Sequence, residues 1–358
     1  MGRRIGLLTS GGDCPGLNAA IRGVARAAYE LIGDVEIVGI ADGYAGLIRG
    51  EYKDLKKDDF SGILTRGGTI LGTSRQPFRN MRVIGEDHVD KVAQMKSNYK
   101  QMRLDCLVAL GGNGTHKTAH LLSCEGLNVI GLPKTIDNDL WGTDVTFGFH
   151  TAVDIATDVI DRIHTTADSH GRVMVVELMG NKAGWLTLYA GVAGGADVVL
   201  IPEIPYDPDR VAAAVRARAA ADKDFSIVAV AEGALTRAEA DMKKRDRLAL
   251  FAENKYRTAA HRVAEAIAAA TGFETRAVVP GHVQRGGTPC PYDRVLSTRL
   301  GVHAARLIRD GIYGVTVAVS GDRTIHNPLS EVAGLSKLVP LDHQMVITAR
   351  QIGIHMGD

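Results

Sequence analysis

The sequence predicts an α/β protein with two doubly wound lobes, each built on a parallel sheet, and three observations support that fold class. First, short apolar runs alternate with longer helical patterns along the whole chain, as in successive βαβ units. Second, these runs are continuous stretches of Val, Ile and Leu, which are typical of strands buried on both faces. Third, 41 of the 358 residues are glycine without a collagen-like period, which favours many tight turns between strands and helices.

In the first half of the chain, apolar runs and helical periodicity predict four strands and two helices. The predicted strands are Arg4–Thr9, Glu36–Ile40, Cys106–Leu110 and Asn128–Leu132, and the predicted helices are Leu17–Leu31 and Lys117–Cys124.

The second half continues the same alternation. Its predicted strands are Val173–Leu178, Val198–Ile201, Ile227–Ala231 and Arg276–Val279, and its predicted helices are Asp209–Ala221, Asn254–Ala270 and Val295–Arg309. The charged segment Leu235–Phe251 is predicted to be a solvated insertion or helix. The length favours two lobes, but composition does not locate their boundary because no Pro-, Gly- or Ser-rich linker divides the chain.

The overall composition excludes several classes of protein. The formal net charge is +1, with 45% apolar and 23% charged residues, which argues against a nucleic-acid-coating protein, an acidic tail or a disordered chain. No segment approaches about 18 uninterrupted apolar residues, so no membrane span is expected. The N-terminus has only the short apolar run Ile5–Leu8 and therefore does not resemble a secretory signal. The four cysteines are scattered and form no CxxC pair, so we expect reduced thiols in a cytoplasmic protein.

Three glycine-rich turns follow predicted strands of the first half: Thr9–Asp13 (TSGGD), Leu110–Thr115 (LGGNGT) and Gly131–Thr135 (GLPKT). The carboxyl ends of parallel strands share one edge of a sheet, so the three turns are expected to converge there. Their backbone N–H groups and the helix N-termini that follow suit a phosphate chain. A Gly-Gly turn after a strand is more often plain turn chemistry, and neither GxxxxGK[ST] nor GxGxxG is present. Only their combination favours a phosphate-handling site.

The segment Pro133–Asp139 (PKTIDND) places two carboxylates, Asp137 and Asp139, two residues apart in one loop. One carboxylate could act as general base on a hydroxyl, and the other could support a metal or a developing charge. Lys134 beside them supplies a cation for phosphate. The alternative is an Asx-turn that caps the segment from Leu140 onward.

A third set of polar residues lies in Pro280–Pro289 (PGHVQRGGTP), directly after a predicted strand. The guanidinium of Arg285 can grip phosphate with two hydrogen bonds, and the two glycines after it allow close approach of a ligand. His282 can donate to the same group. A single His or Arg in a loop is usually an exposed residue with no binding role. Because this loop carries both, together with two glycines, it is predicted to bind an anion.

These motifs together resemble the bacterial 6-phosphofructokinases over nearly the whole chain. IGLLTSGGDCPGLNAAIRGV, GGTILGTSR, GGNGT, PKTIDND, VVELMGN, AEG and PGHVQRGGTP occur in the family's order, and the pair PKTIDND and GHVQRGGTP is highly specific. The resemblance implies the phosphofructokinase fold. Its donor lobe would comprise residues 1–148 plus about 285–334, and its sugar-phosphate lobe 149–284 plus about 335–358.

The resemblance also implies transfer of the γ-phosphoryl group of MgATP to the 1-hydroxyl of fructose 6-phosphate. Asp137 would be the general base, Thr135 would position the transferred group, Asp139 would support the charged centre, and Arg75 would bridge the donor and acceptor phosphates. The implied donor-binding residues are Gly11, Gly12, Arg75, Gly112, Asn113, Gly114, Thr115 and Lys134, with Asn113 also near Mg²⁺.

On the sugar side, the resemblance implies that Met179 and Gly180 line the site and that Glu232 accepts hydrogen bonds from sugar hydroxyls. Thr135 and Asp137 would also contact the sugar. His282 and Arg285 would hold the 6-phosphate. Arg172 and Arg276 match arginines that reach this phosphate from a neighbouring subunit, so the resemblance implies a homotetramer with shared active sites. No nucleic acid or membrane partner is expected.

Donor choice depends on two positions that point in different directions. In the resembled family, Gly at position 114 leaves room for the α-phosphate of a nucleotide, whereas Lys134 is usual in members that use pyrophosphate. The pair resembles a mixed-substrate subgroup in which the glycine decides, so ATP is predicted, with a pyrophosphate-dependent phosphotransferase as the alternative. Asn113 and Asn181 stand where the family usually has a carboxylate and an arginine. They are the only support for a further alternative, a non-catalytic paralogue that binds sugar phosphate.

Overall fold

The computed structural model describes residues 2–84, 89–253 and 258–358 and divides the chain into two compact units. Unit 1 comprises Met1–Ile136, Leu140–Thr151 and Arg285–Lys337, and unit 2 comprises Asp137–Asp139, Ala152–Gln284 and Leu338–Asp358. Neither unit is continuous in sequence, so the chain crosses between the two units several times.

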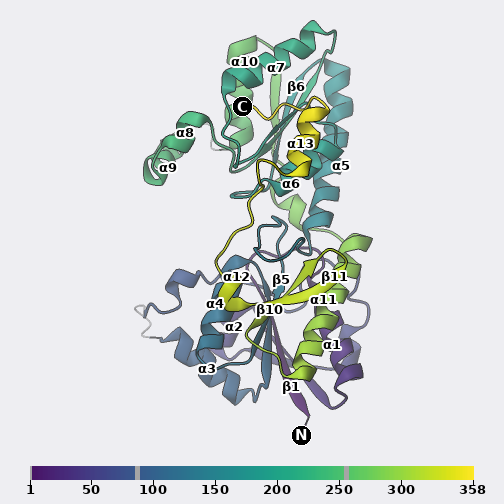
Figure 1. The fold of residues 1–358 in the computed structure, drawn as a ribbon, viewed down its shortest axis with the longest axis vertical. Helices are drawn as coiled ribbons and strands as arrows, with labels where there is room; N and C mark the ends of the chain where they lie inside the picture. Colours follow the sequence, from purple (N-terminus) through teal and green to yellow (C-terminus); the bar gives the residue numbers. More distant parts are fainter. Residues whose placement is uncertain (1, 85–88, 254–257) are drawn as a thin grey trace. The chain divides into compact units, whose positions relative to one another are not determined.

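Unit 1 is built on a seven-stranded sheet in the order β11-β10-β5-β4-β1-β2-β3 (Figure 1). The strands are β1 (Arg3–Ser10), β2 (Val35–Ile40), β3 (Tyr52–Leu55), β4 (Cys106–Gly111), β5 (Val129–Pro133), β10 (Val315–Ser320) and β11 (Arg323–Pro328). The five inner strands run parallel, while β3 and β11 pair antiparallel at the two edges. The inner strands are almost entirely buried, which accounts for their continuous apolar sequence.

Helices cover both faces of this sheet. They are α1 (Leu17–Leu31), α2 (Tyr44–Arg49), α3 (Lys91–Gln101), α4 (Asn113–Cys124), α11 (Pro291–Asp310) and the short α12 (Leu329–Val332). Figure 1 shows α1 and α11 side by side, and two glycines explain how closely they approach. A Cβ atom at Gly23 would lie 2.9 Å from the Thr298 carbonyl oxygen, and one at Gly301 would lie 2.6 Å from the Ala20 carbonyl oxygen.

Unit 2 contains a four-stranded parallel sheet in the order β7-β8-β6-β9. Its strands are β6 (Val173–Leu178), β7 (Val198–Leu200), β8 (Ser226–Ala231) and β9 (Thr275–Val278). The associated helices are α5 (Phe149–His170, which begins in unit 1), α6 (Trp185–Ala193), α7 (Pro208–Ala220), α8 (Arg237–Asp241), α9 (Lys244–Glu253), α10 (Ala259–Thr271) and α13 (Gln344–Gln351). The apolar side chains of β6, β7, β8, α7 and α10 form one core cluster.

The predicted α/β class with two parallel-sheet lobes is confirmed, with antiparallel strands added at both edges of the larger sheet. Helix α1 has the predicted bounds, and the charged segment Leu235–Phe251 forms α8 and most of α9, which bury no residue. Several expected boundaries differ, and helix α11, for example, begins at Pro291, four residues before the predicted Val295. Helix α4 begins at Asn113, four residues before the predicted Lys117, because the glycine turn leads straight into the helix. The predicted start at Asn254 lies outside the described residues, and α10 begins at Ala259 after its N-cap Thr258.

The sequence analysis did not predict several elements, among them β10, β11, α3, α5 and α6. Strand β11 is a largely exposed edge strand with little apolar character, so it carries a weak strand signal. In the part of the chain that the structure describes, no helix combines the length and the apolar character needed to cross a membrane.

Candidate active site

The turn after β1 forms the centre of a cationic site in unit 1. Gly11 has φ +87°, a left-handed conformation that favours glycine. The Lys134 ammonium, at the end of β5, donates a hydrogen bond to the carbonyl oxygen of Gly12. The Lys134 side chain is buried and its backbone N–H donates to the Gly111 carbonyl oxygen at 3.1 Å. The ends of β1, β4 and β5 are therefore joined at this point, as the three glycine turns predict.

Two guanidinium groups approach the same glycine. A Cβ atom at Gly12 would lie 3.1 Å from Nη1 of Arg285 and 3.6 Å from Nη2 of Arg75. Neither arginine forms an ion pair with a carboxylate of the described residues, and the buried Nε of Arg285 has no hydrogen-bond partner there. Two guanidinium groups without a carboxylate partner among the described residues, together with the Lys134 ammonium at the same glycine peptide, favour a polyanionic ligand.

Arg75 reaches this position because its loop is tied to the end of β1. The Gly11 N–H donates to the Ser74 carbonyl oxygen (3.0 Å), and the Thr73 hydroxyl donates back to the Gly11 carbonyl oxygen (2.6 Å). The Thr9 hydroxyl donates to the Gly72 carbonyl oxygen at 2.6 Å. These bonds hold Ser74, and so the residue after it, against the glycine turn.

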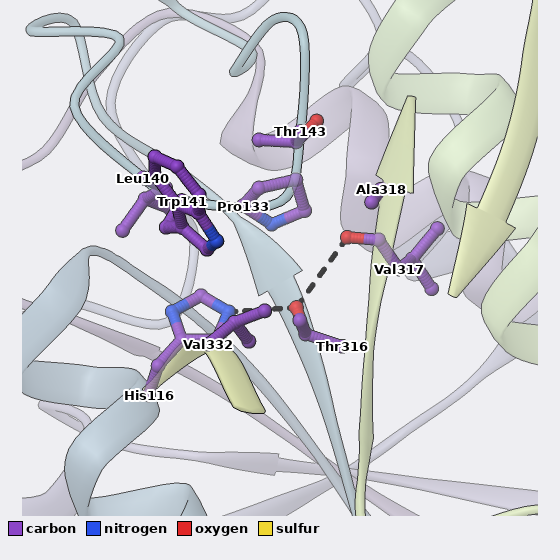
Figure 2. Close-up of a pocket in the computed structure, with 9 residues that line it drawn as sticks. All are labelled: His116, Pro133, Leu140, Trp141, Thr143, Thr316, Val317, Ala318 and Val332. Atoms are coloured by element: carbon purple, nitrogen blue, oxygen red, sulfur yellow. Dashed lines mark hydrogen bonds between the residues drawn. The ribbon is translucent and has the colours of Figure 1, made fainter. Parts of the chain in front are cut away.

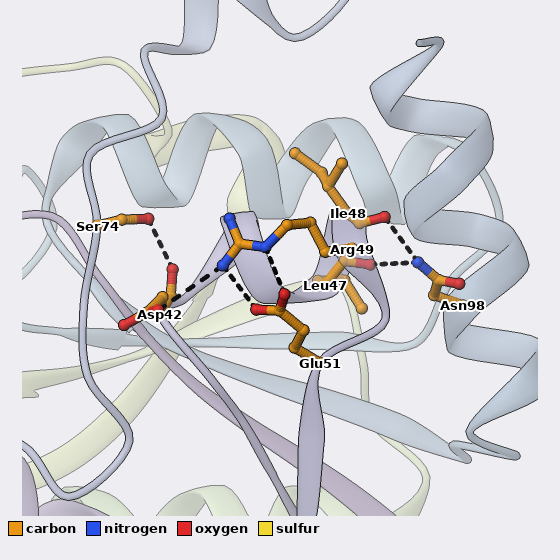
Figure 3. A network of polar contacts seen from close by, with 7 residues as sticks. All are labelled: Asp42, Leu47, Ile48, Arg49, Glu51, Ser74 and Asn98. Atoms are coloured by element: carbon orange, nitrogen blue, oxygen red, sulfur yellow. Dashed lines mark hydrogen bonds and ion pairs between the residues drawn. The ribbon is translucent and has the colours of Figure 1, made fainter.

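A second set of polar contacts connects the loop that carries Ser74 and Arg75 to the segment around helix α2 (Figure 3). The Ser74 hydroxyl donates to the carbonyl oxygen of Asp42 at 2.6 Å, and the Asp42 carboxylate lies 3.7 Å from Arg49. Arg49 also donates two hydrogen bonds to Glu51, at 2.8 and 2.6 Å. Asn98 of α3 donates to two carbonyl oxygens at the end of α2, each at 2.8 Å.

The turn after β4 leads into helix α4 with space beside it. A Cβ atom at Gly114 would have no heavy atom within 4 Å, so this position faces open space at the N-terminus of the helix. The Thr115 side chain instead points inward, where its hydroxyl donates to the Ser10 carbonyl oxygen at 3.3 Å. The predicted donor-binding glycines thus lie at the same sheet edge as the three cations.

The Asn113 side chain is engaged by the segment after α12. Its amide oxygen accepts a hydrogen bond from the Gly334 N–H (2.7 Å), and its amide nitrogen donates to the Leu335 carbonyl oxygen (3.0 Å). An amide oxygen has a second lone pair, so the predicted contact with Mg²⁺ stays a prediction. The sequence analysis missed this contact because no local pattern links residues more than 200 positions apart.

The loop Lys134–Asp139 holds the predicted catalytic carboxylates. Asp137 and Asp139 are half-buried, and Asn138 between them has φ +50°. The carbonyl oxygen of Thr135 accepts a hydrogen bond from the Thr146 hydroxyl at 2.7 Å. Carboxylate oxygens are ligands that Mg²⁺ prefers, so the loop fits a magnesium role. No cluster of three or more His, Cys, Asp or Glu side chains arranged for a metal occurs in residues 2–84, 89–253 and 258–358.

Unit 2 brings the predicted sugar-binding residues together at the carboxyl ends of β6 and β8. The Glu232 N–H donates to the Leu178 carbonyl oxygen (2.9 Å), and the Gly233 N–H donates to the Gly180 carbonyl oxygen (3.2 Å). Gly180 has φ +136°, which an L-residue with a side chain rarely adopts. Met179 and Gly180 therefore lie beside Glu232, whose side chain is exposed.

Gln284 is a structural residue of this region that the sequence analysis missed. Its side chain is fully buried, accepts from the Met179 N–H at 3.0 Å and donates to the Gly281 carbonyl oxygen at 3.1 Å. It ties the loop that carries His282, which is exposed, to the end of β6. The signal was available in the GHVQR motif, where an amide lies between two residues predicted to bind an anion.

Arg172 and Arg276 lie at the opposite, amino-terminal end of the unit 2 sheet. Arg172 immediately precedes β6, and Arg276 is the second residue of the neighbouring strand β9. Both pair with Glu274, at 2.9 and 2.6 Å. Within unit 2 the structure therefore brings these arginines to each other and not to Met179, Gly180 and Glu232.

The buried thiol of Cys14 lies behind the cationic turn. Burial raises its pKa to about 12, so Cys14 stays a protonated thiol at neutral pH. All four cysteines, each within the described residues, are free thiols.

Fold and site together define an α/β protein that gathers three cations and the N-terminus of helix α4 at one edge of a parallel sheet. The chain belongs to the phosphofructokinase family: the family model described as "Phosphofructokinase" matches residues 4–308. It is 57% identical over 361 residues to the ATP-dependent 6-phosphofructokinase of Spirochaeta thermophila, which covers 99% of this chain and 98% of that protein. ATP-dependent 6-phosphofructokinase 3 of Bacteroides thetaiotaomicron is 50% identical over 355 residues, covering 99% of this chain and 100% of that protein.

Solved structures show the same fold. Phosphofructokinase from Saccharomyces cerevisiae has a TM-score of 0.78 and 31% identity over 92% of this chain, and the match spans 45% of the yeast chain. A pyrophosphate-dependent phosphofructokinase from Nitrosospira multiformis has a TM-score of 0.82, with 99% of this chain and 93% of that chain covered. At 20% identity the latter similarity shows the fold alone.

Proposed function

We infer that this chain is an ATP-dependent 6-phosphofructokinase that transfers the γ-phosphoryl group of ATP to the 1-hydroxyl of fructose 6-phosphate, a step of glycolysis. The observation that carries this inference is the convergence of Lys134, Arg75 and Arg285 on Gly12, in a chain with full-length relatives named for this activity. The geometry suits a reaction that depends on positioning and charge neutralisation.

The roles of individual residues follow as proposals from their chemistry. Asp137 takes the proton of the attacking hydroxyl, while Thr135 and Asp139 position and support the reacting group. Arg75, Arg285 and Lys134 neutralise phosphate charge around the glycine turn. The remaining proposed donor contacts are Gly11, Gly12, Gly112, Asn113, Gly114 and Thr115.

Magnesium is the proposed cofactor, with Asn113 as an oxygen donor in the protein. When bound, it would neutralise charge on the donor phosphates. The proposed sugar contacts are Thr135, Asp137, Met179, Gly180, Glu232, His282 and Arg285, the last two at the 6-phosphate. Arg172 and Arg276 are supplied by a neighbouring subunit of a homotetramer. We place the enzyme in the cytoplasm.

The direct test supplies purified protein with Mg²⁺, fructose 6-phosphate and either ATP or pyrophosphate, and measures fructose 1,6-bisphosphate. Turnover with ATP is expected. Turnover with pyrophosphate alone would establish the alternative donor, and absence of turnover with both, in folded protein, would contradict the proposed function.

Replacing Gly114 by Asp tests the donor directly. The open space beside Gly114 would be filled by a carboxylate that repels the donor phosphates, so ATP turnover should fall by about a hundredfold or more. Gly114→Ala, which adds a methyl group without charge, is the matched control and should retain much more activity. Unchanged use of ATP by Gly114→Asp would contradict the assigned role of this position.

A further inference from the structure

A buried imidazole lies directly behind the Gly112–Gly114 turn. His116, in the first turn of α4, is 3% exposed and uses both ring nitrogens, of which Figure 2 shows the contact with Thr316. Nδ1 lies 3.0 Å from the Gly112 carbonyl oxygen, and Nε2 lies 2.8 Å from the Thr316 hydroxyl on β10. The ring thus links the glycine turn after β4 to a strand two places away in the sheet.

The partners of the ring determine its tautomer. A carbonyl oxygen only accepts hydrogen bonds, so the nitrogen facing Gly112 must carry the proton. The other nitrogen of a neutral ring then accepts from the Thr316 hydroxyl. That hydroxyl has a single hydrogen, and its 2.8 Å contact with His116 is shorter than the 3.4 Å contact with the Val317 carbonyl oxygen. His116 therefore donates to the turn and accepts from the sheet.

The sheet is shaped to admit this ring. Gly131 of β5 pairs in register with Thr316, and a Cβ atom at Gly131 would lie 2.7 Å from Nε2 of His116. The same Cβ atom would lie 2.9 Å from the Thr316 hydroxyl oxygen. Glycine weakens a strand interior, and here it leaves the space that the imidazole and its partner need.

The contact with His116 restrains a turn whose backbone is otherwise flexible. Gly111, Gly112 and Gly114 have no side chains to restrict the backbone, and no side chain caps the start of α4. Both the backbone N–H of His116 and its Nδ1 donate to the Gly112 carbonyl oxygen, so the turn is held by one residue through two bonds.

We propose that His116 is a positioning residue for the phosphoryl donor, which it serves by fixing the Gly112 carbonyl and thereby the N–H groups of the glycine turn. The inference rests on the proposed function, in which this turn binds the donor. The imidazole acts through Gly112 and does not contact the donor. A turn that is already fixed loses less conformational entropy when the donor binds. A change at His116 should therefore alter the affinity for the donor and not the affinity for the sugar.

Two substitutions separate the two ring contacts. The short amide of His116→Asn can replace Nδ1 and keep the bond to Gly112, whereas the longer amide of His116→Gln can replace Nε2 and keep the bond to Thr316. Both lose the aromatic ring and should unfold at similar urea concentrations, so stability is matched between them. His116→Gln should raise the donor KM about tenfold, the factor expected for one lost hydrogen bond, with the sugar KM within about twofold. His116→Asn should keep the donor KM within about twofold of the wild type.

Equal donor KM values in the two variants, or parallel changes in donor and sugar KM, would overturn the proposal. If His116→Gln does not fold, His116→Leu decides, since it fills the same space with no donor to Gly112: a donor KM several times higher supports the proposal and an unchanged one refutes it. Absence of turnover by the wild type would count against the proposed function instead. In that case the ATP dissociation constants of the same variants, measured by calorimetry with Mg²⁺, still test the role of His116.

Discussion

At the scale of single residues, Gly12 shows how an absent side chain organises a site. The guanidinium groups of Arg75 and Arg285 occupy the space that a Cβ atom would enter, and the Lys134 ammonium binds the carbonyl oxygen of the same residue. A phosphate chain placed there would meet backbone N–H groups and three cations without displacing a carboxylate from either arginine.

The buried ring of His116 makes stability depend on pH. Burial lowers the pKa of His116 to about 4; the bond to Gly112 opposes this shift, and the nearby Lys134 ammonium adds to it. The unfolded chain has an ordinary histidine pKa near 6.5, so between pH 6.5 and 4 it binds more protons than the folded protein. The folded state therefore loses stability as the pH falls through this window.

At pH 5 this single group should cost the folded protein about 2 kcal/mol relative to pH 7. Urea unfolding at both pH values, in the wild type and in His116→Asn, measures the effect by difference, since carboxylates contribute equally to both proteins. The wild type should lose about 2 kcal/mol more than the variant on acidification. Equal losses in the two proteins would show that the histidine is not buried in its neutral form.

At the scale of elements, helix α5 depends on a carboxylate from another helix. Asp293, in the first turn of α11, is fully buried. It accepts hydrogen bonds from the Gly148 N–H (3.0 Å), the Thr151 N–H (2.7 Å) and the Thr151 hydroxyl (2.6 Å) at the start of α5. It serves as an N-cap supplied from a distance of more than 140 residues.

Removing this cap should be costly. Asp293→Ala leaves three buried donors without an acceptor, so the free energy of unfolding should fall by about 3 kcal/mol. Asp246→Ala, on the exposed helix α9, is the matched control and should change stability by less than about 0.5 kcal/mol. Urea denaturation of both variants makes the comparison, and similar losses in the two would contradict the capping role.

Local sequence patterns predicted some of these elements and not others. Local signals predicted α1, β4 and the three glycine turns, because their apolar runs and turn residues are contiguous. They did not predict β11, whose exposed edge position removes its apolar pattern, or α5, whose cap lies in α11. Gln284 and His116 were missed as site residues for a related reason: their partners are distant in sequence, and packing alone defines them.

At the scale of the whole molecule, the arginine pair at the amino end of the unit 2 sheet suggests that one subunit completes the site of another. Arg172 and Arg276 share Glu274, on the sheet edge opposite Met179 and Glu232. In the proposed homotetramer these arginines would face a neighbouring subunit and would be available to its substrate.

Hybrid oligomers test this arrangement. Asp137→Asn removes the proposed base and Arg276→Ala removes the shared cation, so each variant alone should be nearly inactive. When the two are unfolded and refolded together, about a quarter of the sites should combine an intact base with an intact arginine and regain activity. Refolding each variant separately is the control, and no recovery in the mixture would contradict the shared site.

The strand order of unit 1 also means that two neighbouring strands of the sheet are synthesised far apart in time. Strand β5 is complete at Pro133, but its neighbour β10 begins only at Val315. At usual rates of translation, roughly 10 to 35 s pass between the two, during which the newly made edge of β5 has no strand beside it. Hairpins form in microseconds, so this edge is open for a very long time on the scale of strand pairing. A nascent chain stalled before residue 315 should therefore recruit chaperones, because the strand that completes this side of the sheet lies in about the last eighth of the chain.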